Sequence, residues 1–355
     1  MEPGLLENNE MSIRGPQLVD GPSHHGRANA APHITTLPPE LLAEIFLHFL
    51  PIYPASPPCA GPLSPLLLCR ICRRWRIVAL STPTLWRAIS MDFFSKTHDL
   101  PIQELELLEN WVSRSGKCPL SVSVRIGNLL DPLLMDRLLH AVMAHCRRWE
   151  HVTLLIPTSH LHLIQGEMPQ LRYLNFGPTN FSRTHNPLML FDRAPQLRTL
   201  ALAPNFLTSA LHLPWAQITH LESASLYEYE CLEILSEATR LICFSVTVCD
   251  NPSNVPVVEA AIPVRPHLCD LALRVDDPDY YWRWKILDRL TLPALRTLQI
   301  SEPFITLGSL NAFISRSQCT LRELRVTHAT FPESVFRNVL PTFGAIILEN
   351  ANSDE

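Results

Sequence analysis

The chain has 355 residues, of which 46% are hydrophobic and 18% charged, so most of it can form a buried core. Its 29 Lys and Arg residues against 34 Asp and Glu residues give a net charge of −5, whereas a general binder of phosphate backbones is expected to carry a basic surplus. Only 11 glycines accompany 32 prolines, which disfavours phosphate-cradling glycine loops and favours short elements separated by turns.

Residues 1–33 are polar and interrupted by prolines, and we expect them to form a disordered N-terminal tail, with a second short tail at 349–355. No stretch has the length and hydrophobicity of a signal peptide core or a membrane span, so no membrane association is expected. The ten cysteines show no regular pairing, which favours a reducing compartment, the cytoplasm and/or the nucleus.

The first periodic segment runs from Leu37 to Leu50, and its apolar residues recur at helical spacing. Prolines and Glu40 in the first turn suit a helix start. Six prolines at 51–65 predict a loop, after which Ser64-Pro65 is a start signal for a helix over 66–80. Thr82-Pro83 repeats this signal and predicts a third short helix over 84–89. The region therefore predicts a small three-helix bundle.

Three groups of residues in this bundle resemble the F-box motif. They are Leu37-Pro38-x-Glu40-Leu41-Leu42-x-Glu44-Ile45-Phe46, then Cys72-Arg73-x-Trp75-Arg76, then Pro83-x-Leu85-Trp86. The proline-rich segment 51–65 is longer than the tight turn that many F-boxes have at that point. The chain as a whole is similar to the expanded F-box families of mushroom-forming fungi, in which an F-box precedes degenerate leucine-rich repeats.

The resemblance implies an F-box-like domain over 34–95 that docks onto a Skp-family adaptor and, through it, a cullin-RING ubiquitin ligase. The residues that it implies for adaptor contact are Leu37, Pro38, Leu41, Leu42, Ile45, Phe46, Leu68, Cys72, Trp75 and Trp86.

After the bundle, periodicity predicts a helix over 104–115, a strand over 119–124, a helix over 132–148 and a strand from Trp149. From Leu171 onward the pattern L-x-x-L-x-apolar recurs, and its units start 21–27 residues apart, within the range of leucine-rich repeats. The seven units start at Leu171, Leu197, Ile218, Leu241, Leu268, Leu295 and Leu321.

Stacking of such units predicts an α/β solenoid over 96–348, so the expected fold is a mixture of α+β and α/β: a small helical bundle followed by a leucine-rich-repeat-like array. An open α/β layer of similar strands is the alternative. If the leucines point inward, the residues between them face a target; these are Tyr173, Asn175, Thr199, His220, Ser245, Asp270, Arg274, Gln299, Glu323 and Arg325. Their mixed charge suits a protein epitope better than nucleic acid.

Other clusters have simpler structural interpretations. Cys69 and Cys72 form a C-x-x-C without a second ligand pair, so a mid-helix structural role is expected in place of a metal site. A cluster of arginines is interpreted as a solvated helix face or as a contact for an acidic adaptor; its members are Arg70, Arg73, Arg74, Arg76 and Arg87. The segment 276–284, with three aspartates and four aromatic residues, is interpreted as a capped turn packed on the core, with a recognition hot spot as the alternative.

We find no catalytic motif and expect no cofactor, no bound metal and no enzymatic activity. The function expected from the resemblance is a substrate-recognition subunit of an SCF-type (Skp–cullin–F-box) ubiquitin ligase. A scaffold with one fixed partner, and an enzyme whose site the sequence does not reveal, are the alternatives.

Overall fold

The structure is a computed structural model, and it describes residues 37–94, 102–127, 131–180, 188–204, 206–249, 264–275, 286–339 and 344–349. The chain divides into two units, Met1–Pro38 and Pro39–Glu355. The predicted N-terminal tail, all but Glu349 of the C-terminal tail and the segment 276–284 lie outside the described residues. The larger unit is a mixed α/β structure built on a parallel sheet of 11 strands.

The helical elements at the start of this unit are short. They are α1 (Pro39–Phe49), α2 (Pro65–Ile71), α3 (Arg73–Leu80) and the 3-10 turn η2 (Pro83–Trp86). Ser64 caps α2 because its Oγ accepts a hydrogen bond from the Leu66 N–H at 3.2 Å, as its sequence predicts.

Two predictions for this region are corrected. The expected helix over 66–80 is broken at Cys72, whose backbone is extended (φ −155°, ψ 169°) and whose Sγ accepts the Trp75 N–H at 3.4 Å. Cys72 therefore ends one helix and caps the next, and it does not lie mid-helix. The expected third helix over 84–89 is instead the turn η2 followed by strand β1 (Ala88–Phe93), because Ile89, Met91 and Phe93 alternate into the core.

The main sheet has strands that follow one another in chain order, each parallel to the last. Its strands are β1, β2 (Leu120–Ile126), β3 (Trp149–Ile156), β4 (Tyr173–Pro178), β6 (Thr199–Leu202), β8 (His220–Tyr227), β9 (Cys243–Cys249), β10 (Asp270–Arg274), β11 (Thr297–Ser301), β12 (Glu323–Thr327) and β13 (Ala345–Glu349). Strands β5 (Leu188–Met189) and β7 (Leu211–His212) form a separate small pair.

Each of the seven repeat units places a strand where the pattern predicts one. The second apolar residues of the units lie opposite one another across the sheet and are buried: Leu174, Leu200, Leu221, Phe244, Leu271, Leu298 and Leu324. The weaker unit pairs in register up to Ser223, which replaces the usual apolar residue and is also buried, and the pairing with β9 shifts between Ser223 and Leu226.

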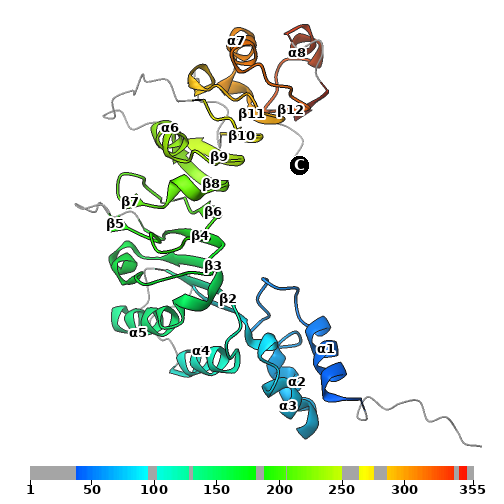
Figure 1. Cartoon of the computed structure of the whole chain (residues 1–355), viewed down its shortest axis with the longest axis vertical. Helices are drawn as coiled ribbons and strands as arrows, with labels where there is room; N and C mark the ends of the chain where they lie inside the picture. The colour runs from blue at the N-terminus through cyan, green and yellow to red at the C-terminus, as the bar shows by residue number, and fades with distance from the viewer. Residues whose placement is uncertain are drawn as a thin grey trace, which may run out of the picture. The chain divides into compact units, whose positions relative to one another are not determined.

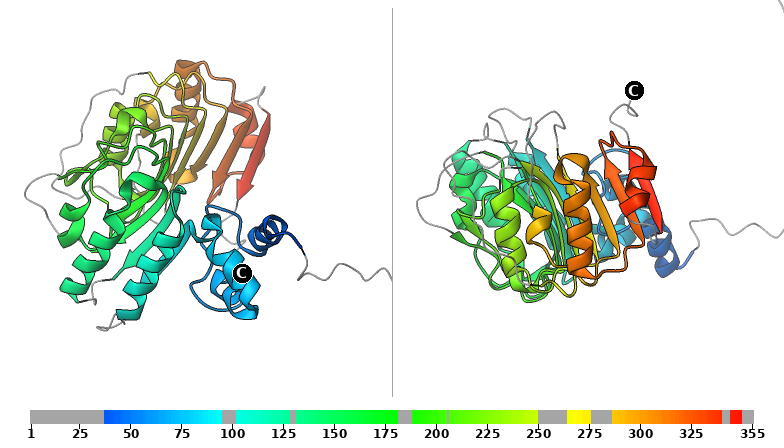
Figure 2. Two further views of the ribbon diagram at one scale, coloured as in Figure 1. Left: turned by 60° about the horizontal axis from the view of Figure 1, so that its bottom comes forward. Right: turned by 90° about the horizontal axis from the view of Figure 1, so that it is seen from above.

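Helices fill the connections between strands. They are α4 (Ile102–Arg114), α5 (Pro132–Met143), α6 (Glu228–Glu237), α7 (Leu307–Ser317) and α8 (Glu333–Val339), together with the 3-10 turns η3 (Cys146–Arg148), η4 (Thr158–Leu163), η5 (Trp215–Gln217), η6 (Ile286–Arg289) and η7 (Glu302–Phe304). Helices α4 to α7 lie on one side of the sheet (Figures 1 and 2). We call the opposite side the open face. Within the described ranges, no helix is long and apolar enough to cross a bilayer.

The core is continuous from the first helices into the sheet. Trp86 of η2 and Trp111 of α4 are fully buried and meet edge to face, with ring centroids 5.0 Å apart. The Trp111 Nε1–H also donates to the Ala88 carbonyl at 3.1 Å. Residues of the predicted 34–95 and 96–348 domains thus share one hydrophobic core.

Candidate interaction surfaces

Exposed apolar side chains are concentrated in the first three helices and the loop between them. Of the 14 large hydrophobic side chains found exposed among the described residues, eight lie between residues 41 and 80. They are Leu41, Ile45, Ile52, Leu63, Leu67, Ile71, Ile77 and Leu80. Such a concentration on a short segment is typical of a surface that a partner covers.

On α1 the predicted apolar stripe divides between two faces. Leu41 and Ile45 are 54% and 41% exposed and lie one turn apart, whereas Leu42 and Phe46 are buried. The buried pair packs inward, and the Phe46 ring lies 4.9 Å from that of Trp75. Only half of the stripe is therefore open to a partner.

Four residues of the predicted adaptor-contact set are buried inside the chain. Leu42, Phe46, Leu68 and Trp86 belong to the core of the chain itself. Trp86 is also fixed by a hydrogen bond from its Nε1–H to the Ala79 carbonyl at 2.8 Å. The other members remain accessible at least in part: Leu41, Ile45, Pro38 and Cys72 are exposed, and Leu37 and Trp75 are half-buried.

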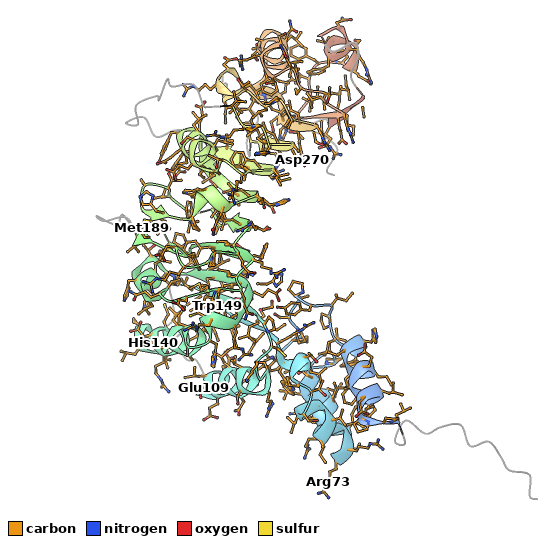
Figure 3. The ribbon with its side chains drawn as sticks, in the orientation of Figure 1. Arg73, Glu109, His140, Trp149, Met189 and Asp270 are labelled. Carbon is orange, nitrogen blue, oxygen red and sulfur yellow. The ribbon has the colours of Figure 1, made fainter. Side chains whose placement is uncertain are left out.

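Arginines border this apolar surface. Arg70, Arg73 and Arg76 are exposed; Arg73 is labelled in Figure 3 at the junction of α2 and α3. The Arg76 Nε–H donates to the Cys69 carbonyl at 2.7 Å, and no ion pair joins Arg70 or Arg73 to a described residue. The combination suits a partner that offers apolar side chains with carboxylates around them.

The ten residues predicted to face a target all lie on the open face. Strand pairing sets them in rows that run across the strands: Tyr173, Thr199, His220, Asp270 and Glu323 in the first row, Asn175, Ser245, Gln299 and Arg325 in the second, and Arg274 in a third. His220 is exposed and the other nine are half-buried. The structure thus brings all ten together on one surface.

Some charges on this face are already paired. Arg325 lies 3.2 Å from Glu323 and 3.0 Å from Glu349, and the Arg274 Nη2 donates to the Ser245 Oγ at 2.8 Å. Glu222, which sequence analysis did not select, lies in the second row between Ala201 and Ser245. Neither Glu222 nor Asp270 forms an ion pair with any described residue, so the middle of the face has a local negative charge.

A second group that sequence analysis missed lies where the loop 51–65 meets the sheet. The Tyr53 hydroxyl donates to the Glu150 Oε2 at 2.9 Å, and the Tyr53 ring lies edge-on to His151 at 5.4 Å. The Arg87 guanidinium lies 3.9 Å from the centre of the Tyr53 ring. Burial, reinforced by Glu150, raises the pKa of Tyr53, while burial lowers the pKa of His151. In the sequence, this contact is indicated only by the fact that Tyr53 is the sole aromatic residue of the proline-rich segment.

The other candidate sites are a cysteine pair and two open hollows. Burial raises the pKa of the Cys69 thiol, and among the residues that the structure describes no cluster of three His, Cys, Asp or Glu side chains could hold a metal ion. An open hollow of about 740 Å³ lies between α4 and α5, lined in part by Glu109 and His140 (Figure 3). A second one of about 700 Å³ lies between η5 and the end of α6.

No protein-family model matches the chain, and no curated protein is significantly similar to it. The features that bear on function are therefore the exposed apolar surface of the first helices, the open face of the sheet and the motif in the first helices.

Proposed function

We propose that the chain is a substrate-recognition subunit of an SCF-type ubiquitin ligase. Residues 37–92 would act as an F-box that docks onto a Skp-family adaptor, and the repeat region would form a leucine-rich-repeat-like solenoid that binds a protein target. The subunit performs no chemistry in this proposal; it raises the effective concentration of the target near an activated ubiquitin.

The observation that carries the proposal is the exposed apolar surface of α1 to α3, which includes Leu41 and Ile45 of the segment that resembles the F-box motif. Burying a leucine or isoleucine side chain fully contributes about 1.5–3 kcal/mol. Leu41 and Ile45, one turn apart on α1, can present such side chains together to a groove between helices of a partner.

The arrangement of the sheet supports the repeat part of the proposal. Strand order follows chain order throughout and every pairing in the main sheet is parallel, as expected when each unit stacks only on its neighbours. An open doubly wound α/β layer usually reverses strand order at one point and carries helices on both faces. The open face is polar and mixed in charge, which suits a protein target.

The test is co-expression of the full chain with a Skp-family adaptor, followed by co-purification. The variant Leu41→Glu/Ile45→Glu should lose the adaptor, because a carboxylate buried against apolar side chains without a partner costs several kcal/mol. Both side chains are exposed, so this variant should fold, as circular dichroism can verify.

The matched control is Leu133→Glu, at a leucine of α5 that is 74% exposed and lies outside the first three helices. It should keep the adaptor. A soluble wild-type chain that does not retain the adaptor would contradict the proposal and favour a scaffold with another fixed partner.

A further inference from the structure

The proline-rich loop occupies the beginning of the open face. Ala88 and Ser121 point to this face by strand alternation, yet they are only 5% and 7% exposed. The Ser121 Oγ–H donates to the Pro54 carbonyl at 2.7 Å, and Tyr53 packs on His151. Tyr53 and Pro54 thus occupy the beginning of the first row, at strands β2 and β3.

The same row continues beyond the loop. Ala88, Ser121, His151 and Tyr173 are paired in succession across β1 to β4, and the row passes on through Thr199 and His220 to Asp270. The rings of His151 and Tyr173 are 6.2 Å apart, so the aromatic part of the row runs from the covered stretch into the accessible one.

The covered stretch shows what kind of segment this row accepts. Residues 51–58 are neither helix nor strand, and they engage the row through one carbonyl oxygen and one aromatic ring. The Arg87 guanidinium lies over that ring, and the Glu150 carboxylate accepts a hydrogen bond from its hydroxyl. A cation, an aromatic ring and a carboxylate therefore act together there.

The accessible stretch contains an aromatic ring and carboxylates, whereas none of its residues in the first row is an arginine or lysine. The Arg274 guanidinium bonds Ser245, on the side of Glu222 away from Tyr173. Tyr173 lies close enough to Glu222 for that carboxylate to help burial raise the pKa of the phenol. Asp270 lies further along the row and accepts only the Cys243 thiol, at 3.7 Å, among the bonds that the described residues form.

We propose that the part of this row from Tyr173 to Asp270 binds an extended target segment that carries arginine or lysine residues and continues along the row from Tyr53 and Pro54. The guanidinium or ammonium group lies over the Tyr173 ring and is neutralised by Glu222, and Asp270, four strands beyond Tyr173 in the sheet, pairs with a second basic side chain of the same segment. This inference rests on the proposed function, since it specifies the chemistry of the target on the repeat surface.

The probe is a random dodecapeptide phage library selected on the full-length chain. Enriched peptides should contain arginine or lysine, and their affinity for the chain, measured by fluorescence anisotropy with the synthetic peptide, should fall as the salt concentration rises. The variant Glu222→Gln/Asp270→Asn should weaken binding about three- to tenfold, the range for losing two partly exposed charge contacts.

The matched control is Glu237→Gln, which removes an exposed carboxylate from α6 on the helical side of the sheet and should leave peptide affinity unchanged. Enriched peptides without basic residues, affinities unaffected by the double variant, or a selection that enriches no peptide would each overturn the inference.

Failure of the two proposals can be told apart with the same proteins. Leu41→Glu/Ile45→Glu should lose the Skp-family adaptor yet keep the selected peptide, and Glu222→Gln/Asp270→Asn should behave in the opposite way. If the chain binds the adaptor but Glu222→Gln/Asp270→Asn does not weaken peptide binding, only the inference about the row is refuted. If the double variant weakens peptide binding but the wild-type chain does not bind the adaptor, only the ligase proposal is refuted.

Discussion

The contact between Tyr53 and the sheet makes a quantitative prediction for the variant Tyr53→Ala. It removes the hydrogen bond to Glu150, the stacking of the Arg87 guanidinium and the edge contact with His151. A hydrogen bond to a charged acceptor, a partly exposed cation–π contact and an aromatic pair together amount to about 2–4 kcal/mol. The variant should therefore lower the free energy of unfolding by that amount.

Urea unfolding, followed by tryptophan fluorescence, measures this loss of stability. Two further variants separate the contribution of the hydroxyl from that of the ring. Tyr53→Phe keeps the ring contacts and should cost only about 1–2 kcal/mol, because it removes the hydroxyl alone. A double-mutant cycle of Tyr53→Phe with Glu150→Gln should give a coupling energy of about 1 kcal/mol, since the two groups bond directly. Limited proteolysis should also cut Tyr53→Ala faster within residues 51–65.

The reasoning would be refuted if Tyr53→Ala cost less than about 0.5 kcal/mol, the size expected of an ordinary surface substitution. The loop would then rest on the sheet without holding the helices to it.

Period-two patterning explains why the open face could be predicted. In each repeat that follows the pattern, every second residue of the strand is a large apolar residue that is buried. Because side chains alternate along a strand, the residues between them lie together on the other face of the sheet. Register across the strands follows from the fixed place of the strand in each unit. Glu222 was missed because its unit departs from the pattern at Ser223.

The first helices show where such patterning fails. Leu41 and Leu42 are identical residues in adjacent positions, and so periodicity cannot tell which of them faces the core. The contact between Phe46 and Trp75, which are about 30 residues apart in the sequence, determines which side of α1 faces the core. Similarly, Cys72 interrupts a helix without proline or glycine, because its thiol and extended backbone form a cap that propensities do not reveal.

The role of the proline-rich segment could not be predicted at all. Its composition indicates a loop, but its contacts reach residues 67 and 97 positions further along the chain. The sequence presents it as an insertion that lengthens a turn between helices, whereas the structure shows that it covers part of the open face. Long-range contacts of single side chains leave no periodic signal in a sequence.

Two further substitutions test the interior of the sheet. A Cβ added at Gly177 would lie 2.4 Å from the Cβ of Ala203, so Gly177→Ala should destabilise the chain by about 1–3 kcal/mol, and adding Ala203→Gly should restore most of that loss in the same urea assay. Equal stability of the two variants would contradict this packing. Glu230 is fully buried, and its carboxylate accepts the N–H groups of Thr208 at 2.8 Å and Tyr227 at 3.0 Å. Burial raises the pKa of Glu230 despite these bonds, so folding favours the protonated form. The stability that this preference contributes is complete below the unfolded pKa of about 4.3 and is lost as the pH rises through the folded pKa. Glu230→Gln cannot titrate, so its thermal unfolding midpoint should decline less than that of the wild type as the pH rises from about 4 towards neutrality. The variant should nevertheless be less stable by about 1–3 kcal/mol at the acidic end, because an amide NH₂ cannot accept the second backbone N–H. Parallel pH profiles for the two proteins would show that the Glu230 carboxyl does not titrate differently in the folded and unfolded chains.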